Sequence, residues 1–200
     1  MFVSLFEKSE TEMKRKISNK ELVFMAICIA LGLVCKIFIA PLTNIVTDFI
    51  RLPGGSAVSA FAILFLAIGV SVTNWRCAGT IAGLLQAVLA LCLGMSSNQG
   101  LFAFVTFTVP GMVIDVIRLF MKDRDSVYLL VSCTLSNVAG AIASNFIVFG
   151  FESAMLILWL LVAACFGIMA GGIGSVLIRR MNCFSEFTQM RSAARRTQNL

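Results

Sequence analysis

Few residue types in this chain could carry out catalysis or bind a metal, and they are not grouped as a catalytic site. Histidine, the commonest metal ligand and proton shuttle, is absent. The seven cysteines are spread singly with no CxxC spacing, so neither a metal cluster nor a disulfide framework is indicated. The sequence also contains no GxSxG motif, no phosphate-cradling loop and no paired carboxylates within its apolar runs. We therefore expect no catalytic residues, no metal site and no cofactor, and hence no enzymatic activity of the chain itself.

Amide, charged and aromatic side chains suit the binding of a small molecule instead. Amides both donate and accept hydrogen bonds, which fits a heterocycle with ring nitrogens and carbonyls, and aromatic rings line largely apolar pockets. The predicted substrate-binding residues are Lys36, Asn44, Asp48, Arg51, Asn98, Gln99, Phe102, Asn145, Phe146, Glu152 and Trp159. The charges in this set have mixed signs, so they do not fix the charge of the ligand. We expect a neutral or zwitterionic small molecule.

Some of these residues could have a structural role instead of a role in binding. The aromatic rings of Phe102, Phe146 and Trp159 could form an interfacial belt at the membrane surface rather than a pocket wall. Lys36, near the outer end of the first apolar run, either snorkels to the lipid headgroups or points inward at an anionic ligand. Both alternatives remain open on the sequence alone.

Other polar residues lie inside apolar runs, where they are costly. Asn137 and Asn145 are eight residues apart and fall near one helix face, and buried amides require hydrogen-bond partners. We predict that Asn137 links helices and that Asn145, nearer the outer end, contacts the ligand. Asp115 and Arg118 are three residues apart, share a helix face and are expected to pair with each other near the inner surface.

The composition indicates that the elements carrying these residues are embedded in a membrane. Of the 200 residues, 59% are hydrophobic and only 13% are charged, whereas soluble domains carry about 25% charged residues. Such a chain lacks the polar surface of a soluble protein. The net charge of +6 is concentrated at the predicted membrane borders, so we expect a lipid bilayer, and no nucleic acid, as its environment.

Six continuous apolar runs must position the polar residues, and each approaches the length of a membrane-spanning helix. They cover residues 22–41, 56–73, 77–93, 101–121, 127–149 and 153–178. Their continuous rather than alternating hydrophobicity argues against a β-barrel. We predict an all-α integral membrane protein, with a bundle of six transmembrane helices in residues 21–180, a basic N-terminal tail at 1–20 and a basic C-terminal tail at 181–200.

Lysine and arginine predict the orientation of the bundle, because they stay on the cytoplasmic side. Fourteen of the sixteen lie in the N-terminal tail, at or after residue 179, or in connections at 76 and 118–124. Both termini are therefore predicted to be cytoplasmic. The outer face then carries the polar segments 41–55, 94–100 and 150–152. We expect residues 44–55 to roof a ligand pocket walled by the fourth, fifth and sixth helices.

Small residues four apart allow close helix contacts in lipid. Gly79 with Gly83 and Gly167 with Gly171 have this spacing and are expected to pack helices within the bundle. Ala26 and Ala30 have it in the cytoplasmic half of the first run, within the segment KELVFMAICIA that follows the basic tail. We predict that these two alanines lie on an exposed face.

With six apolar runs, this length and this first helix, the chain resembles the substrate-binding S components of energy-coupling-factor (ECF) vitamin transporters. In that family an AxxxA motif of the first helix docks on a shared transmembrane coupling subunit, which here corresponds to Ala26 and Ala30. The Pro53-Gly54-Gly55 stretch is similar to the loop that closes the family's pocket. The substrate motifs of biotin, riboflavin, thiamine or metal-binding members are not present, so the resemblance does not assign the vitamin.

The resemblance implies a subunit of an ECF-type ABC transporter in the cell membrane of a prokaryote. It would capture a vitamin or vitamin precursor from outside, and a coupling subunit with two ATPase subunits would drive release inside. Two alternatives of other classes remain. One is an intramembrane enzyme acting on a lipid-linked substrate, and the other is a structural subunit of a membrane complex.

Overall fold

The computed structural model describes residues 19–50, 55–73, 75, 77–94, 100–121, 125–148 and 153–181, and only the backbone at 44, 46–50, 55–56, 101, 125, 147–148 and 153–155. Nearly all of the described residues are helical, as the sequence predicts. The helices are α2 (Asn19–Ile50), α3 (Gly55–Val72), α4 (Ala78–Cys92), the 3-10 turn η1 (Gly100–Phe102), α5 (Ala103–Phe120), α6 (Asp125–Val148) and α7 (Ser153–Met181).

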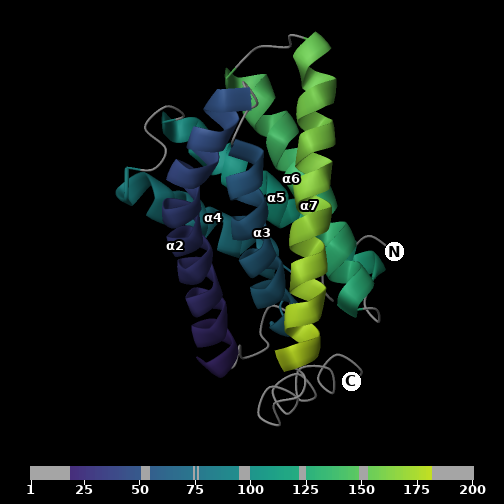
Figure 1. Ribbon diagram of the computed structural model, residues 1–200. Coiled ribbons are helices and arrows are strands. Elements are labelled where there is room, and N and C mark those ends of the chain that lie inside the picture. The colour runs from purple at the N-terminus through teal and green to yellow at the C-terminus, as the bar shows by residue number, and fades with distance from the viewer. Residues whose placement is uncertain are drawn as a thin grey trace, which may run out of the picture.

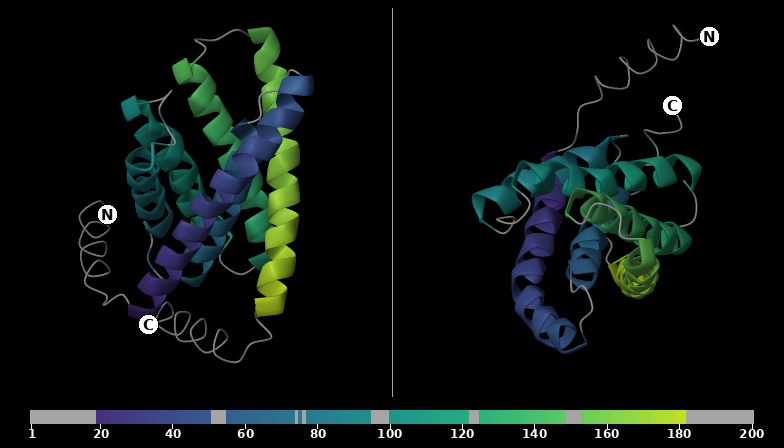
Figure 2. Two further views of the ribbon diagram at one scale, coloured as in Figure 1. Left: turned by 60° about the vertical axis from the view of Figure 1, so that its left-hand side comes forward. Right: turned by 90° about the horizontal axis from the view of Figure 1, so that it is seen from above.

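Successive helices run in opposite directions through the bundle (Figures 1 and 2). The helix α2 begins, and α7 ends, at what we call the Asn19 end. The opposite end, where α2 ends and α3 begins, is called the Ile50 end (Figure 1). The first and last described helices therefore have their outer chain ends at the same end of the bundle. The sequence predicts that the Asn19 end is cytoplasmic.

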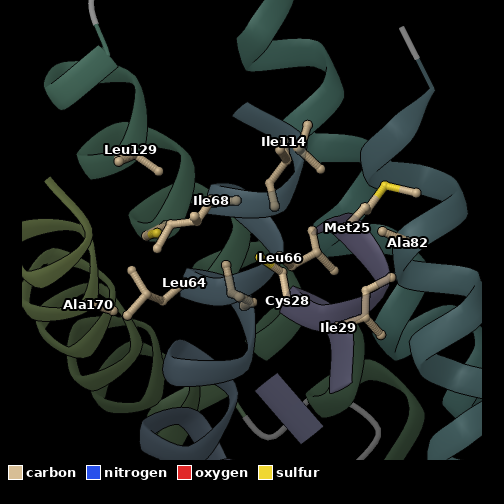
Figure 3. Close-up of a cluster of buried hydrophobic side chains, with 14 of the residues drawn as sticks. Met25, Cys28, Ile29, Leu64, Leu66, Ile68, Ala82, Ile114, Leu129 and Ala170 are labelled. Atoms are coloured by element: carbon tan, nitrogen blue, oxygen red, sulfur yellow. The ribbon is translucent and has the colours of Figure 1, made fainter. Parts of the chain in front are cut away.

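The helix α3 lies at the centre of the bundle and contacts each of the other five α-helices (Figure 1). Its sequence is apolar on all sides, and most of its side chains from Ala57 to Val72 are buried, as expected for a helix surrounded by others. Figure 3 shows side chains of α3 packed among those of its neighbours. The labelled residues are Met25, Cys28, Ile29, Leu64, Leu66, Ile68, Ala82, Ile114, Leu129 and Ala170.

The outside of the bundle is apolar as well. Large hydrophobic side chains are exposed along α2, α4, α5, α6 and α7, among them Phe38, Leu119 and Ile157. An apolar surface of this extent suits contact with lipid rather than water. Four helices, α2, α5, α6 and α7, are long and apolar enough to cross a membrane, which is compatible with a membrane location. The helices α3 and α4 are apolar but shorter.

The structure differs from the sequence prediction after the first apolar run. We expected residues 41–55 to form an outer loop, but α2 continues through Pro41 to Ile50. Just after Pro41, the Thr43 hydroxyl donates to the carbonyl oxygens of Ile39 and Ala40 at 2.9 and 3.0 Å. A proline removes one helix hydrogen bond but is tolerated in membrane helices, where hydroxyl side chains and neighbouring helices re-satisfy the backbone. Residues 51–54 lie outside the described residues.

Glycines allow very close contact between two pairs of helices. A Cβ atom added to Gly83 of α4 would lie 2.6 Å from the Phe107 carbonyl oxygen of α5. One added to Gly167 or Gly171 of α7 would lie 2.6 Å from the backbone of α6. The predicted packing role of these small residues is therefore confirmed, in line with the use of small residues at helix contacts in membranes.

Candidate functional site

Asp115 of α5 caps the beginning of α4. Its carboxylate accepts hydrogen bonds from the backbone N–H of Gly79 at 2.8 Å, from the N–H of Thr80 at 2.7 Å, and from the Thr80 hydroxyl at 2.7 Å. The residue at the N-cap position of α4, Cys77, makes no side-chain capping bond of its own. The first N–H groups of a helix lack intrahelical partners and carry partial positive charge, so a buried carboxylate from a neighbouring helix satisfies them.

Arg118 binds the other half of the same hairpin. Its guanidinium donates to the carbonyl oxygen of Trp75 at 3.1 Å and to that of Thr73, just after the last residue of α3. Cations stabilise helix C-termini, where carbonyl groups lack partners. The expectation that Asp115 and Arg118 pair with each other is wrong in the described structure. They share a face of α5, but each binds a different end of the α3–α4 connection.

Asn137 of α6 joins three helices. Its amide oxygen accepts a hydrogen bond from the Ser59 hydroxyl of α3 at 2.7 Å, and its amide nitrogen donates to the Ala163 carbonyl oxygen of α7 at 2.8 Å. The side chain is 1% exposed. The prediction that Asn137 links helices is confirmed.

Two other buried amides are not engaged in this way. The amide nitrogens of Gln86 in α4 and Asn145 in α6 have no hydrogen-bond partner among the described residues, although the two side chains are only 3% and 8% exposed. The Thr108 hydroxyl of α5 is likewise buried and has no partner in the part of the chain that the structure describes. Buried polar groups are costly unless they are paired, and nearly all of them in native proteins are hydrogen-bonded. A bound molecule could therefore satisfy these three groups.

The contact between α5 and α6 locates two of these groups relative to each other. A Cβ atom at Gly140 of α6 would lie 3.1 Å from the Pro110 ring of α5, so the helices cross there. At about 1.5 Å per residue, Thr108 lies about 3 Å from this crossing along α5. Asn145 lies about 8 Å from it along α6. Both displacements are toward the Ile50 end.

The contact between α4 and α5 gives the positions of Gln86 and of the Lys36 ammonium. Gln86 lies one turn beyond Gly83 toward the Ile50 end, about 5 Å along α4, and Gly83 packs against the Phe107 backbone. The Lys36 ammonium of α2 lies 4.1 Å from the centre of the Phe107 ring. We call Lys36, Gln86, Thr108 and Asn145 the interior polar set.

Lys36 belongs to the inward face of α2. Three and four residues before it are the buried Leu33 and Gly32, and seven before it is the buried Ile29, the spacing of one helix face. The contact with the Phe107 ring of α5 has the geometry of a cation–π interaction. Of the two interpretations that the sequence left open, the structure favours the inward one over snorkelling to the headgroups.

The other predicted binding residues whose side chains the structure describes are not part of the interior polar set. Phe102 and Phe146 are 60% and 64% exposed, which favours an interfacial belt over a place inside the bundle, and Trp159 of α7 is partly buried. The side chains of Asn44 and Asp48, and all of Arg51, Asn98, Gln99 and Glu152, lie outside the described residues.

Gln86 was missed by the sequence analysis, although a signal was present. It is the one amide in the otherwise apolar run of α4, whose buried positions recur every three to four residues and include 86. An amide in that register has to find a partner inside the bundle.

Ala26 and Ala30 are both exposed, on the side of α2 that faces away from α3. The same face carries the exposed apolar side chains Leu22, Ile27 and Val34. The prediction that the two alanines are exposed is confirmed, and their role in docking stays a prediction. Within the described part of the chain no three His, Cys, Asp or Glu residues gather as a metal site.

Comparison with known proteins identifies no relative: no family model matches this chain, and no curated protein or solved structure does so either.

Proposed function

We propose that this chain is the membrane-embedded substrate-binding subunit, or S component, of an ECF-type ABC transporter that captures a vitamin or vitamin precursor from outside for ATP-driven uptake. The observation that carries the proposal is that the buried amide nitrogens of Gln86 and Asn145 have no hydrogen-bond partner among the residues that the structure describes. The proposed location is the plasma membrane of a prokaryote, with several crossings and both termini inside.

The pattern of satisfied and unsatisfied groups supports binding rather than packing as the role of these amides. Asn137, with the same side chain as Asn145 on the same helix, has both halves of its amide engaged by neighbouring helices. A bundle that needed Asn145 only for packing would lose nothing by placing an apolar residue there, because an unpartnered buried amide is unfavourable. A ligand with acceptors and donors, such as a heterocycle, would supply the missing partner.

Release and energy coupling are assigned to partner subunits. We propose that the exposed face of α2 with Ala26 and Ala30 docks on a transmembrane coupling subunit, and that this subunit works with two ATPase subunits. Small residues on an exposed face let another helix approach closely. Such a contact needs a partner outside this chain.

An intramembrane enzyme would need a free carboxylate, and the carboxylate of Asp115 is already hydrogen-bonded within the protein. The two oxygens of Asp115 accept three hydrogen bonds at the beginning of α4. A general base must be within hydrogen-bond reach of the proton that it abstracts, and this carboxylate is surrounded by structural donors. The binding function therefore has better support than the alternative of an intramembrane enzyme.

The proposal is tested by purifying the protein in mild detergent and identifying co-purified small molecules by mass spectrometry. The affinity for the molecule found is then measured in wild type, Asn145→Ala and Gln86→Ala. Loss of a hydrogen bond from a buried amide should weaken binding by roughly tenfold. Asn19→Ala, an exposed asparagine at the Asn19 end, should leave the affinity unchanged.

Asn137→Ala separates binding from folding, because it removes a buried amide that is already engaged by the protein. We expect it to lower thermal stability more than affinity. If Asn137→Ala weakens binding as much as Asn145→Ala does, the effect of both is on folding and the site is misplaced. A wild-type protein that retains no small molecule, and binds none from growth medium, contradicts the proposed function.

A further inference from the structure

Lys36 is the ionisable member of the interior polar set, and the described structure does not neutralise it. Its ammonium lies over the Phe107 ring, and it makes no hydrogen bond or ion pair with the residues that the structure describes. Charged residues in membrane-spanning segments typically face the interior of a bundle and pair with another group there. An aromatic face attracts a cation but does not accept hydrogen bonds in the way that oxygen does, and the ammonium has three donors.

The described carboxylates are too distant or already engaged to serve Lys36. Glu21 lies fifteen residues earlier on α2, about 22 Å along the helix axis. Asp115 lies eight residues beyond Phe107 on α5, about 12 Å along that helix, and its oxygens bind Gly79 and Thr80. Neither acid occupies the position that would pair with this ammonium.

The three uncharged residues of the interior polar set supply hydrogen-bond donors on the Ile50-end side of the contacts between α5 and its neighbours. The amide nitrogens of Gln86 and Asn145 and the hydroxyl of Thr108 are buried and unpartnered among the described residues. All three lie toward the Ile50 end of the contacts that α5 makes with α4 and α6. A molecule that reached them from the Ile50 end would meet donors from three helices and one positive charge from a fourth.

We infer that the molecule bound by this chain carries a carboxylate, and that this carboxylate pairs with the Lys36 ammonium while donors of the interior polar set bind the rest of the ligand. The inference rests on the proposed function, because it names the chemical class of the ligand for the same site. A singly charged carboxylate matches a single cation. A phosphate ester, with a charge of about −1.5 to −2 at neutral pH, would bring excess negative charge into an apolar interior.

The test uses pairs of small aromatic probes. The two members of a pair are identical except that one carries a carboxylate and the other a carboxamide. The pairs are pyridine-3-carboxylate with pyridine-3-carboxamide, pyrimidine-5-carboxylate with its amide, and benzoate with benzamide. Thermal stabilisation and affinity are measured for the detergent-purified wild type, Lys36→Met, Lys36→Arg and Lys20→Met. Lys20 is an exposed lysine on the same helix, so Lys20→Met controls for the loss of one positive charge. The charge of any molecule that co-purifies with wild type is determined in parallel.

We expect the acid of at least one pair to bind at least tenfold more tightly than its amide in wild type and in Lys20→Met. The preference should be lost in Lys36→Met and largely kept in Lys36→Arg, which preserves the charge. Amides that bind as well as their acids, a preference that survives Lys36→Met, or a co-purified molecule without a carboxylate each overturn the inference. In those cases a bound molecule still supports the proposed function. Binding of no probe together with no co-purified molecule contradicts both.

Discussion

Replacing Asp115 tests the capping of α4 from a neighbouring helix. Asp115→Ala leaves the N–H groups of Gly79 and Thr80 and the Thr80 hydroxyl without their acceptor, in a place where Asp115 is only 8% exposed. Loss of an N-cap costs about 0.5–2 kcal/mol, and a partly buried charge at a helix terminus contributes up to about 2 kcal/mol. A buried donor left unsatisfied costs about 1–3 kcal/mol.

These contributions overlap, so their sum is not the expected effect. We expect Asp115→Ala to lower the free energy of unfolding by roughly 3 kcal/mol, which for a chain of this size is a fall in Tm of about 6–12 °C. Asp115→Asn keeps the shape and one acceptor oxygen but turns an amino group toward the backbone donors. The free energy of unfolding of Asp115→Asn should lie between those of the wild type and Asp115→Ala.

A thiol-reactive dye gives the melting curve, because Cys28 and Cys133 are buried in the folded protein at 6% and 0% exposure. Thr106→Ala is the matched control on the same helix, since the Thr106 hydroxyl bonds only to its own helix at an exposed position. A Tm for Asp115→Ala within about 2 °C of this control, less than about 1 kcal/mol for a chain of this size, would refute the capping role. Asp115 would then be an interfacial charge of little structural consequence.

Three further predictions follow from the contacts. Gly79→Ala and Gly111→Ala should each destabilise the fold by about 1–3 kcal/mol or more, because the added Cβ would meet the backbone of the facing helix. Gly172→Ala, where nothing lies within 4 Å of the added atom, should have the Tm of wild type or a higher one. Asn137→Ala should lower the free energy of unfolding by about 1–3 kcal/mol, measured by the same melting curves. Ala30→Arg should abolish co-purification with a coupling subunit and ATP-driven uptake while leaving small-molecule binding intact; loss of both would indicate misfolding instead.

The positions of the helices could be predicted well from the sequence, because continuous apolar runs bounded by charged or glycine-containing segments give strong signals. The predicted runs 77–93 and 127–149 correspond to α4 at Ala78–Cys92 and α6 at Asp125–Val148. The end of α2 was missed, since Pro41 and the polar residues after it favour a turn. The apolar residues Leu42, Ile45 and Val46 nevertheless keep a helical spacing in this stretch.

The partners of the polar residues were harder to predict than their positions. A spacing of three residues places Asp115 and Arg118 on one face, but it does not say what lies opposite that face. The backbone N–H groups at the start of α4 and the carbonyl groups after α3 come within reach of α5 only through tertiary packing. A pattern of side chains in the sequence does not show where such backbone groups will lie. Gln86 could have been recognised as a buried amide from its register in the apolar run of α4, but the sequence does not show which groups surround it.

The contrasting environments of the two asparagines of α6 follow from the unequal lengths of the helices around them. Asn137 is level with Ser59 of α3, to which it is hydrogen-bonded. Asn145 lies eight residues further along α6, about 12 Å, whereas α3 extends only four residues, about 6 Å, from Ser59 to its first residue, Gly55. Measured along the helix axes, Asn145 therefore lies about 6 Å beyond the level of Gly55, the first residue of α3. A short central helix among longer neighbours leaves polar groups unsatisfied at one end of the bundle, and this is where we expect the ligand to bind.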